Sequence, residues 1–250
     1  MSRPPVQPLA WDTKFLGFPV ARLAARHLLA AELLALVEQQ RAAGTRLLYL
    51  LADPADAETA AAVRRAGARL LDRRVTFGQE IGPPLAASTD QPAAASARSA
   101  AVRVAAATVF TPGLEALAWQ SGEFSRFRLD ERFAPHVFHD LYSQWLRASL
   151  AGELARVVFA AGRPNSEEAG LLTLGEEAGT ASIGLLAVVA AVRGRGVGRQ
   201  LVAAARQQAQ AWGCTRLTVV TQRDNGPACG FYAACGFVPV REEHVYHLWL

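Results

Sequence analysis

The stretch IGLLAVVAAVRGRGVG, residues 183–198, joins an apolar run to a loop rich in glycine and arginine. The apolar run at residues 181–190 is typical of a strand that is buried on both faces. The residues after the loop, 196–213, carry apolar side chains at helical spacing. Glycine lets backbone N–H groups approach a ligand, and a helix N-terminus has unpaired amides and a positive dipole end. The stretch therefore predicts a strand–loop–helix unit that binds a diphosphate.

The loop does not have the pattern of a dinucleotide site or of a Walker loop. A dinucleotide site needs G-x-G-x-x-G and an acidic residue on the next strand, but the strand expected at residues 216–221 has no carboxylate. A Walker loop needs a lysine after its last glycine, and Lys14 is the only lysine of the chain. Arg193, Arg195 and Arg199 would add charge-assisted contacts to phosphate. With these two patterns excluded, the remaining kind of diphosphate site is a loop that binds the pyrophosphate of an acyl-coenzyme A. The alternative is a tight turn that binds no ligand.

A second motif, NGPACGFYAACGF at residues 225–237, follows the strand expected at residues 216–221. Together the two motifs resemble the Gcn5-related N-acetyltransferase (GNAT) superfamily. Its signatures are [QR]-x-x-G-x-[GA] after a buried strand, and N-x-x-A-x-x-x-Y-x-x-x-G-F. The positions that match the second signature are Asn225, Ala228, Tyr232, Gly236 and Phe237. The resemblance implies an α/β fold with a central mixed sheet and an acetyl-CoA-dependent N-acetyltransferase.

The resemblance also implies roles for individual residues, with acetyl-CoA as co-substrate and no metal. The pantetheine arm would pair with the backbone of the buried strand, and the pyrophosphate would lie on the loop amides. Tyr232 would act as a general acid toward the thioester sulfur, the alternative being an aromatic side chain that only packs. The residues expected to bind acetyl-CoA are Leu186, Val188, Val189, Arg193, Gly194, Arg195, Gly196, Val197, Gly198, Arg199 and Asn225. The superfamily usually has proline in place of Ala190, a common variation.

The expected strand at residues 181–190 contains no Asp, Glu or His, so no side-chain base is predicted on it. The amine of a sugar is less basic than that of lysine, and a chain of water molecules could remove its proton. Cys229 and Cys235 flank Tyr232 in sequence. No base is evident near them, so we expect them to be small packing residues rather than acyl carriers.

Further segments resemble the TDP-fucosamine acetyltransferases of bacterial surface-polysaccharide synthesis. These segments are residues 9–18, 124–130, 183–188 and 246–249. The resemblance implies that the acceptor is the amine of a TDP-linked aminodeoxysugar. Arg126 and Arg128 lie where the superfamily shapes its acceptor pocket, so they could bind the sugar diphosphate, and surface salt bridges are the alternative. Two other functions stay open: acetylation of another amine, such as a peptide N-terminus, a polyamine or an antibiotic, and a non-catalytic acyl-CoA-binding module.

The organisation of the chain predicts two parts of unequal size. Residues 82–101 are rich in alanine, serine and proline and predict a flexible linker. This linker would separate a part at residues 1–81 from a GNAT domain at residues 102–250. The two parts contain a similar unit, in which Thr-Arg-Leu at the start of a strand is followed by a helix and a second strand. The first unit begins at Thr45-Arg46-Leu47 and the second at Thr215-Arg216-Leu217. The first part is therefore predicted to be a partial GNAT-like copy without the glycine-rich loop, unless the similarity arises by chance.

The composition excludes several classes of protein. The 250 residues carry a formal charge of +4, with scattered arginines, which suits a small anionic ligand but not nucleic acid. Three cysteines without a signal peptide argue against a disulfide scaffold, and no apolar run is long enough for a membrane span. We expect a cytoplasmic enzyme whose partner is a small nucleotide sugar, and a homodimer is left open.

Overall fold

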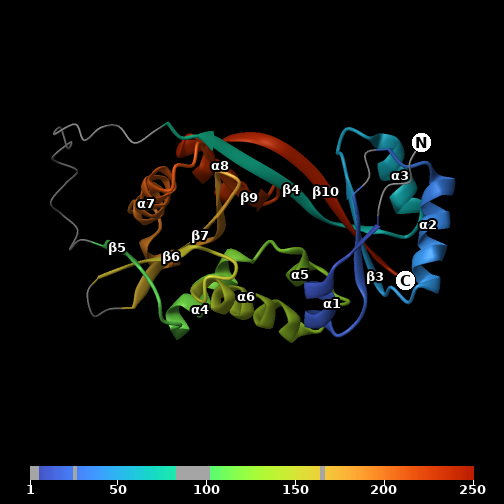
Figure 1. Cartoon of the computed structure of the whole chain (residues 1–250), viewed down its shortest axis with the longest axis horizontal. Helices are drawn as coiled ribbons and strands as arrows, with labels where there is room; N and C mark the ends of the chain where they lie inside the picture. The colour runs from blue at the N-terminus through green and yellow to red at the C-terminus, as the bar shows by residue number, and fades with distance from the viewer. Residues whose placement is uncertain (1–5, 25–26, 83–101, 164–166) are drawn as a thin grey trace.

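The computed structural model describes residues 6–24, 27–82, 102–163 and 167–250. Ten strands form one mixed sheet in the order β1-β2-β3-β10-β4-β9-β8-β7-β6-β5 (Figure 1). The strands are β1 Val6–Pro8, β2 Val20–Ala24, β3 Leu47–Ala52, β4 Arg69–Glu80, β5 Arg103–Ala106, β6 Val157–Gly162, β7 Glu168–Glu177, β8 Thr180–Val188, β9 Arg216–Gln222 and β10 Val238–Trp249. All but one of the linker residues predicted at 82–101 lie outside the described residues.

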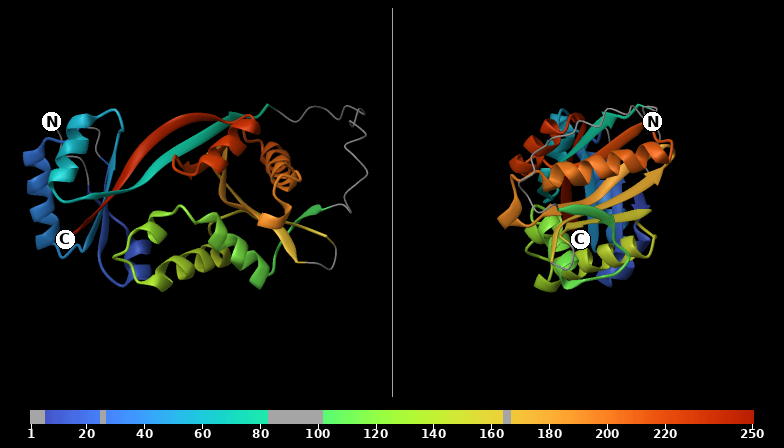
Figure 2. Two further views of the ribbon diagram at one scale, coloured as in Figure 1. Left: turned by 180° about the vertical axis from the view of Figure 1, so that it is seen from behind. Right: turned by 90° about the vertical axis from the view of Figure 1, so that its left-hand side faces the viewer.

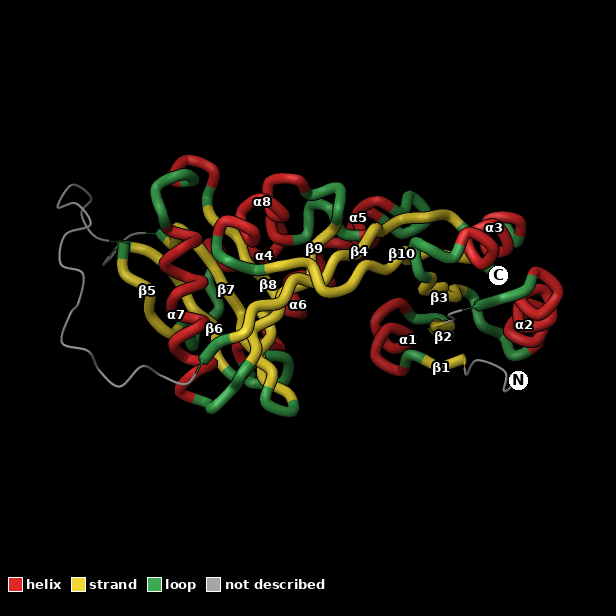
Figure 3. Tube along the Cα trace, turned by 90° about the horizontal axis from the view of Figure 1, so that it is seen from above, coloured by secondary structure: helices red, strands yellow, loops and turns green. Residues whose placement is uncertain are grey.

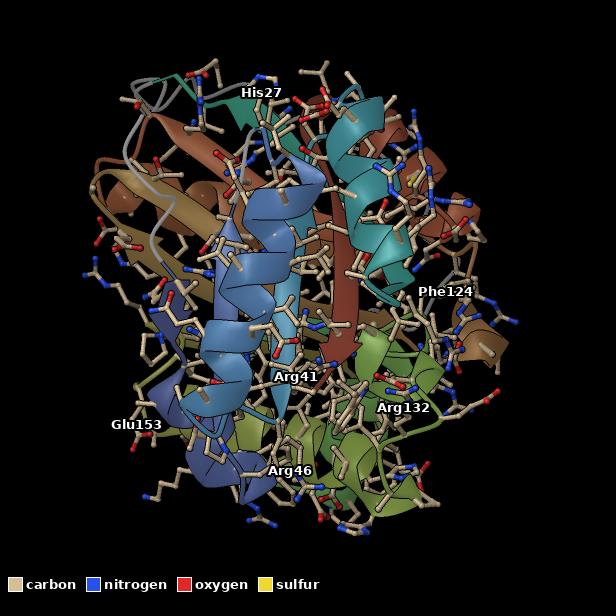
Figure 4. All side chains as sticks on the ribbon, turned by 90° about the vertical axis from the view of Figure 1, so that its right-hand side faces the viewer. His27, Arg41, Arg46, Phe124, Arg132 and Glu153 are labelled. Carbon is tan, nitrogen blue, oxygen red and sulfur yellow. The ribbon has the colours of Figure 1, made fainter. Side chains whose placement is uncertain are left out.

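Helices cover both faces of this sheet. The helices are α1 Ala10–Leu16, α2 Ala30–Ala42, α3 Ala57–Arg65, α4 Pro112–Ser121, α5 Arg126–Leu129, α6 Pro135–Leu150, α7 Val197–Ala211 and α8 Gly226–Ala234, with a short 3-10 helix η1 at Ala190–Val192. Helices α7 and α6 lie on opposite faces of the sheet (Figure 2), and α2 and α3 lie side by side at the N-terminal end of the molecule (Figure 4). No helix in the described part of the chain is long and apolar enough to cross a membrane.

Local sequence explains where several helices begin. The Thr111 side chain caps α4 by accepting from the N–H of Leu114, and proline occupies the next position, where a missing N–H costs nothing. Asp56 caps α3 in the same way through the N–H of Thr59. These caps satisfy amides that would otherwise lack partners at a helix start. The helices predicted at residues 135–151 and 196–213 are observed at Pro135–Leu150 and Val197–Ala211, and neither of them has a side-chain cap at its start.

The last strand of each half is inserted into the other half. β4 comes from the N-terminal part, but it pairs antiparallel with β9 along Arg74–Glu80. β10 comes from the C-terminal part, but it pairs antiparallel with β3 and β4. The two strands run side by side along the molecule and connect its ends (Figure 3). The predicted division at residues 82–101 therefore does not separate two sheets.

The exchange follows the repeat that the sequence indicates. In the N-terminal half, β3 precedes α3 and β4; in the C-terminal half, β9 precedes α8 and β10. Each penultimate strand then pairs with the last strand of the other half. β10 continues through the break considered at residues 241–243, with an irregularity in its register between Pro239 and Arg241.

We predict that the two halves do not fold independently. A fragment of residues 102–250 leaves β10 without both of its neighbours and β9 without β4, so buried backbone groups lose their hydrogen bonds. Expressed alone, the fragment should lack a cooperative thermal transition. Co-expressed with residues 1–82, it should co-purify as a one-to-one complex that melts cooperatively. A monomeric fragment 102–250 with a native circular dichroism spectrum would contradict this dependence.

Candidate active site

The sheet opens between β8 and β9. These strands pair in parallel only from Thr180 to Ile183, and the remaining residues of β8 pair only with β7 among the described strands. The ladder between β7 and β8 has a bulge, because one residue of β7, Thr173, lies opposite two residues of β8. The Thr173 hydroxyl oxygen accepts a hydrogen bond of 2.8 Å from the N–H of Leu185 and fixes this bulge. Such bulges bend a strand, so β8 leaves β9 and exposes one edge of its backbone.

The glycine-rich loop closes one end of this opening. Gly194 and Gly196 have φ angles of 74° and 86°, in the left-handed region where side chains with a Cβ are strained. Gly196 is the N-cap residue of α7, and no side chain caps this helix. The first amides of α7 are thus available to an anion, and the positive end of the helix dipole points the same way.

A cleft of about 390 Å³ lies between the opening, the loop and α8. Its lining contains nearly all of the residues predicted to bind acetyl-CoA, and Tyr232. The lining residues are Gln120, Ser121, Glu123, Phe124, Leu186, Ala187, Val188, Val192, Arg193, Gly194, Gly196, Val197, Gly198, Arg199, Asn225, Pro227, Ala228, Phe231 and Tyr232. Two predicted residues are not among them: Val189 packs against the core below β8, and Arg195 is exposed on the loop.

Residues of α4 and the segment after it form a wall of the cleft that sequence reasoning missed. Gln120 donates a hydrogen bond of 2.9 Å from Nε2 to the carbonyl of Val188, and Arg193 donates from Nε to the same carbonyl at 3.0 Å. The last carbonyl of β8 is therefore already engaged, so a ligand that pairs with this strand must use other backbone groups. The sequence offered no signal for Gln120, because α4 is distant in the chain and shows only helical spacing.

Tyr232 lies in α8 with its ring packed among aromatic side chains. Its ring centroid is 6.0 Å from that of Phe77, 5.3 Å from Phe231 and 5.9 Å from Phe237. The side chain is only 5% exposed, yet it lines the cleft. Burial raises the pKa of the Tyr232 hydroxyl well above its usual range. Tyr232 therefore keeps its proton at neutral pH and can donate a hydrogen bond into the cleft.

The N-terminal half holds α8 in place. Gln79 of β4 donates from Nε2 to the carbonyls of Cys235 and Gly236, both at 3.3 Å. Arg206 of α7 donates to Gln79 Oε1 at 2.9 Å and to the Cys235 carbonyl at 3.2 Å. The aromatic partner Phe77 also belongs to β4. The orientation of Tyr232 thus depends on a strand from outside the C-terminal part.

Asn225 and the cysteines have structural surroundings. The Asn225 side chain accepts from the N–H of Ala228 at 3.2 Å and caps α8, although Asn225 also lines the cleft. Burial raises the pKa values of the Cys229 and Cys235 thiols, so neither is activated as a thiolate. No group of three or more possible metal ligands occurs in the described ranges.

Arg126 and Arg128 differ in their surroundings and do not line the cleft. The guanidinium of Arg126 lies 4.7 Å above the ring of Tyr49 and 4.6 Å from that of Phe127. It is half-buried where α5 meets strands of the N-terminal half. Arg128 is exposed, and its guanidinium lies 5.2 Å from the ring of Phe138. The structure therefore separates two residues that the sequence treated as a pair.

The architecture is that of the GNAT fold, as the sequence predicted. A GCN5-related N-acetyltransferase from Sphaerobacter thermophilus is similar to this chain with a TM-score of 0.58 at 16% identity, over 98% of this chain and 76% of that one. A tandem GNAT protein from the clavulanic acid biosynthesis pathway is similar with a TM-score of 0.57 at 17% identity, over 93% of this chain and 76% of that one. A GCN5-related N-acetyltransferase from Kribbella flavida is similar with a TM-score of 0.57 at 17% identity, over 99% of this chain and 88% of that one. At these identities the likeness shows the fold.

A family model matches part of the sequence. Residues 114–237 match the model of the acetyltransferase (GNAT) family. The matched region is just under half of the chain, and it contains both the glycine-rich loop and Tyr232. No curated protein matches the chain.

We predict that Gly196→Val and Gly198→Val each abolish acetyl-CoA binding in a protein that still folds. Valine at position 196 strains the φ angle of 86°. At position 198 a Cβ would lie 3.1 Å from the Phe231 ring, which lines the cleft. Isothermal titration with acetyl-CoA measures the loss, and circular dichroism verifies the fold.

Gly213→Val is the matched control for backbone strain. Gly213 also has a positive φ, 78°, but it follows α7 at the end away from the loop, with open space around its Cβ position. This variant should lower the melting temperature and retain acetyl-CoA affinity. Near-native affinity in a folded Gly196→Val protein would place the cofactor elsewhere.

Proposed function

We propose that the chain transfers the acetyl group of acetyl-CoA to a primary amine. The observation that carries this proposal is the junction of three features in one cleft: the free edge of β8, the uncapped N-terminus of α7, and Tyr232. The free strand edge suits the amides of a pantetheine arm. The amides of α7, with Arg193 and Arg199 beside them, suit its pyrophosphate. The match of residues 114–237 to the model of the acetyltransferase (GNAT) family supports the same assignment.

The chemistry follows from the groups that line the cleft. The amine nitrogen attacks the thioester carbonyl, the C–S bond breaks, and the leaving thiolate needs a proton. A tyrosine of pKa about 10 protonates a thiolate whose thiol has a pKa of about 8.5 at a cost of about 2 kcal/mol. Burial raises the pKa of Tyr232 further. Tyr232 therefore stabilises the thiolate by a hydrogen bond and relays the proton released by the amine, rather than ionising first.

For the acceptor, we propose the amine of a TDP-linked aminodeoxysugar. The support is the resemblance of residues 9–18, 124–130 and 246–249 to TDP-fucosamine acetyltransferases, and the mild positive charge of the chain. The nucleotide would provide binding energy remote from the reacting amine, which an enzyme can use to orient that amine. Arg126 and Arg128 remain candidates for the diphosphate.

We predict that Tyr232→Phe lowers kcat by about 10²–10⁴-fold, the usual contribution of a positioned proton donor. The ring and its aromatic packing remain, so acetyl-CoA affinity and melting temperature should be unchanged. Thiol release under saturating substrates measures kcat. Tyr246→Phe is the control, because Tyr246 is a buried tyrosine of β10 outside the cleft. A Tyr232→Phe enzyme with more than half of the original kcat would require another proton donor.

We predict that TDP-linked 4-amino-4,6-dideoxygalactose, or a close isomer, is acetylated with a far higher kcat/KM than the free aminosugar, polyamines or peptides. Acetyl-CoA-dependent thiol release over this panel makes the comparison. Equal values for the free sugar and the nucleotide sugar would exclude the nucleotide as a recognition element. Binding of acetyl-CoA without thiol release for any amine would favour an acyl-CoA-binding module.

A further inference from the structure

Three segments that are far apart in the chain meet at one buried polar contact. The segments are residues 9–18, 124–130 and 246–249. Asp130 ends α5, and its Oδ2 lies 2.6 Å from Nδ1 of His247 and accepts a hydrogen bond of 3.0 Å from Nε1 of Trp249. Phe18 packs against Trp249, with their ring centroids 5.6 Å apart. The contact therefore ties α5 to β10 and, through Phe18, to the N-terminal half.

The pair consists of a carboxylate and a neutral imidazole at neutral pH. The side chains of Asp130 and His247 are each 1% exposed. Burial raises the pKa of the Asp130 carboxyl, but the hydrogen bonds from His247 and Trp249 outweigh burial and hold this pKa below its usual range. Burial lowers the pKa of His247, and the nearby charges of Arg126 and Arg69 add to this effect although Asp130 opposes it. Since an ionised carboxylate only accepts hydrogen bonds, Nδ1 of His247 carries the proton and donates it.

A run of backbone hydrogen bonds connects this contact with the cleft. The N–H of Asp130 donates to the carbonyl of Arg126 at 3.0 Å, and the N–H of Ser125 donates to the carbonyl of Gly122 at 2.8 Å. Ser125 is buried, and its hydroxyl caps α5. Phe124 lies within this run and lines the cleft. A displacement at Asp130 is therefore transmitted to the wall of the cleft.

The contact is better suited to fixing a position than to adding stability. Burying a carboxylate costs free energy that its hydrogen bonds only partly repay, and apolar side chains of similar volume often stabilise a core equally well. Hydrogen bonds to a charged group are strong and directional, however. Asp130 accepts from His247 and Trp249 at Oδ2, and from the N–H of Arg132 at Oδ1 with a distance of 3.2 Å. Three donors thus define where α5 ends.

We propose that Asp130 and His247 are positioning residues for the acceptor, which hold the segment of residues 123–130 against the cleft where the amine binds. The inference rests on the proposed function, because it concerns the acceptor of that reaction. The proposed cofactor contacts are on β8 and α7, so the wall formed by this segment remains for the acceptor. β10 follows α8 directly and carries the contact near its other end. One strand would then set the place of both Tyr232 and this wall.

The test uses His247→Phe and Asp130→Leu in the full chain. His247→Phe keeps a ring beside Tyr49 and Phe133 but removes the donor. Each variant should raise KM about 10- to 100-fold for TDP-linked 4-amino-4,6-dideoxygalactose, or for the amine of the same panel with the highest kcat/KM, the range for a lost hydrogen bond to a charged group. The kcat, and the affinity for coenzyme A by calorimetry, should be unchanged. Backbone hydrogen exchange, followed by mass spectrometry, should accelerate in residues 122–133 and not in α7.

Two further variants separate positioning from stability. Asp130→Asn retains an amide oxygen that can accept from His247 and Trp249, so its KM should lie closer to that of the natural protein than the KM of Asp130→Leu. The double variant Asp130→Leu/His247→Phe leaves neither group of the pair without its partner. Its melting temperature should therefore exceed those of both single variants, while its KM stays raised because the directional contact is absent.

Asp56→Leu is the matched control. Asp56 accepts from the N–H of Thr59 at 3.0 Å and from its hydroxyl at 2.6 Å, and it caps α3 outside the cleft. The control should lower the melting temperature without changing KM or the exchange of residues 122–133.

Four results would overturn the proposal: a natural KM in both single variants, a natural KM in the double variant, an equal loss of coenzyme A affinity, or exchange that accelerates throughout the sheet. Absence of thiol release with every amine would refute the proposed function instead. Faster exchange confined to residues 122–133 would then still support the anchoring of this segment by the pair, and unchanged exchange would overturn it.

Discussion

The pairing of β10 with β4 is the constraint on which the rest of the structure depends. These two strands are the longest of the sheet, at 12 residues each, and they are the last strands of the two halves. Their insertion between β3 and β9 converts two incomplete sheets into one. The core on the α7 and α8 side includes Val75 and Phe77 of β4, and the core beneath α2 and α3 includes Tyr246 and Leu248 of β10. Neither core is complete without a strand from the other half.

This strand exchange also explains why the candidate active site depends on both halves of the chain and not on the glycine-rich loop alone. The loop and the open edge of β8 depend on local features: positive φ angles, an uncapped helix and a bulge. Tyr232 depends on β4 instead, through Phe77 and Gln79. Positioning a proton donor to within hydrogen-bond distance requires a rigid support. The N-terminal half provides that support although it lacks a phosphate-binding loop of its own.

The candidate site residues named from the sequence come from short local motifs. The glycine-rich loop and Asn225 were named from motifs of a few residues, and both line the cleft, while their contact with the cofactor stays a prediction. Gln120 was missed because its place in the cleft arises from a contact between segments far apart in the chain. The strand exchange was missed for a related reason: the residues of β10 indicate a strand but not which strands flank it. Val189 and Arg195 belong to the same motif but do not line the cleft, since side chains along one segment face different ways.

The exchanged strand has a consequence for how the chain folds as it is synthesised. β3 emerges early from the ribosome, but its partner β10 comprises residues 238–249 and appears last. At roughly 5–20 residues per second, the edge of β3 waits on the order of 10–40 s for that partner. An unpaired strand edge is a template for pairing with other chains, and β3 is rich in leucine, as LLYLLA. Chaperone demand during expression should therefore be greatest before the final 12-residue strand has been released.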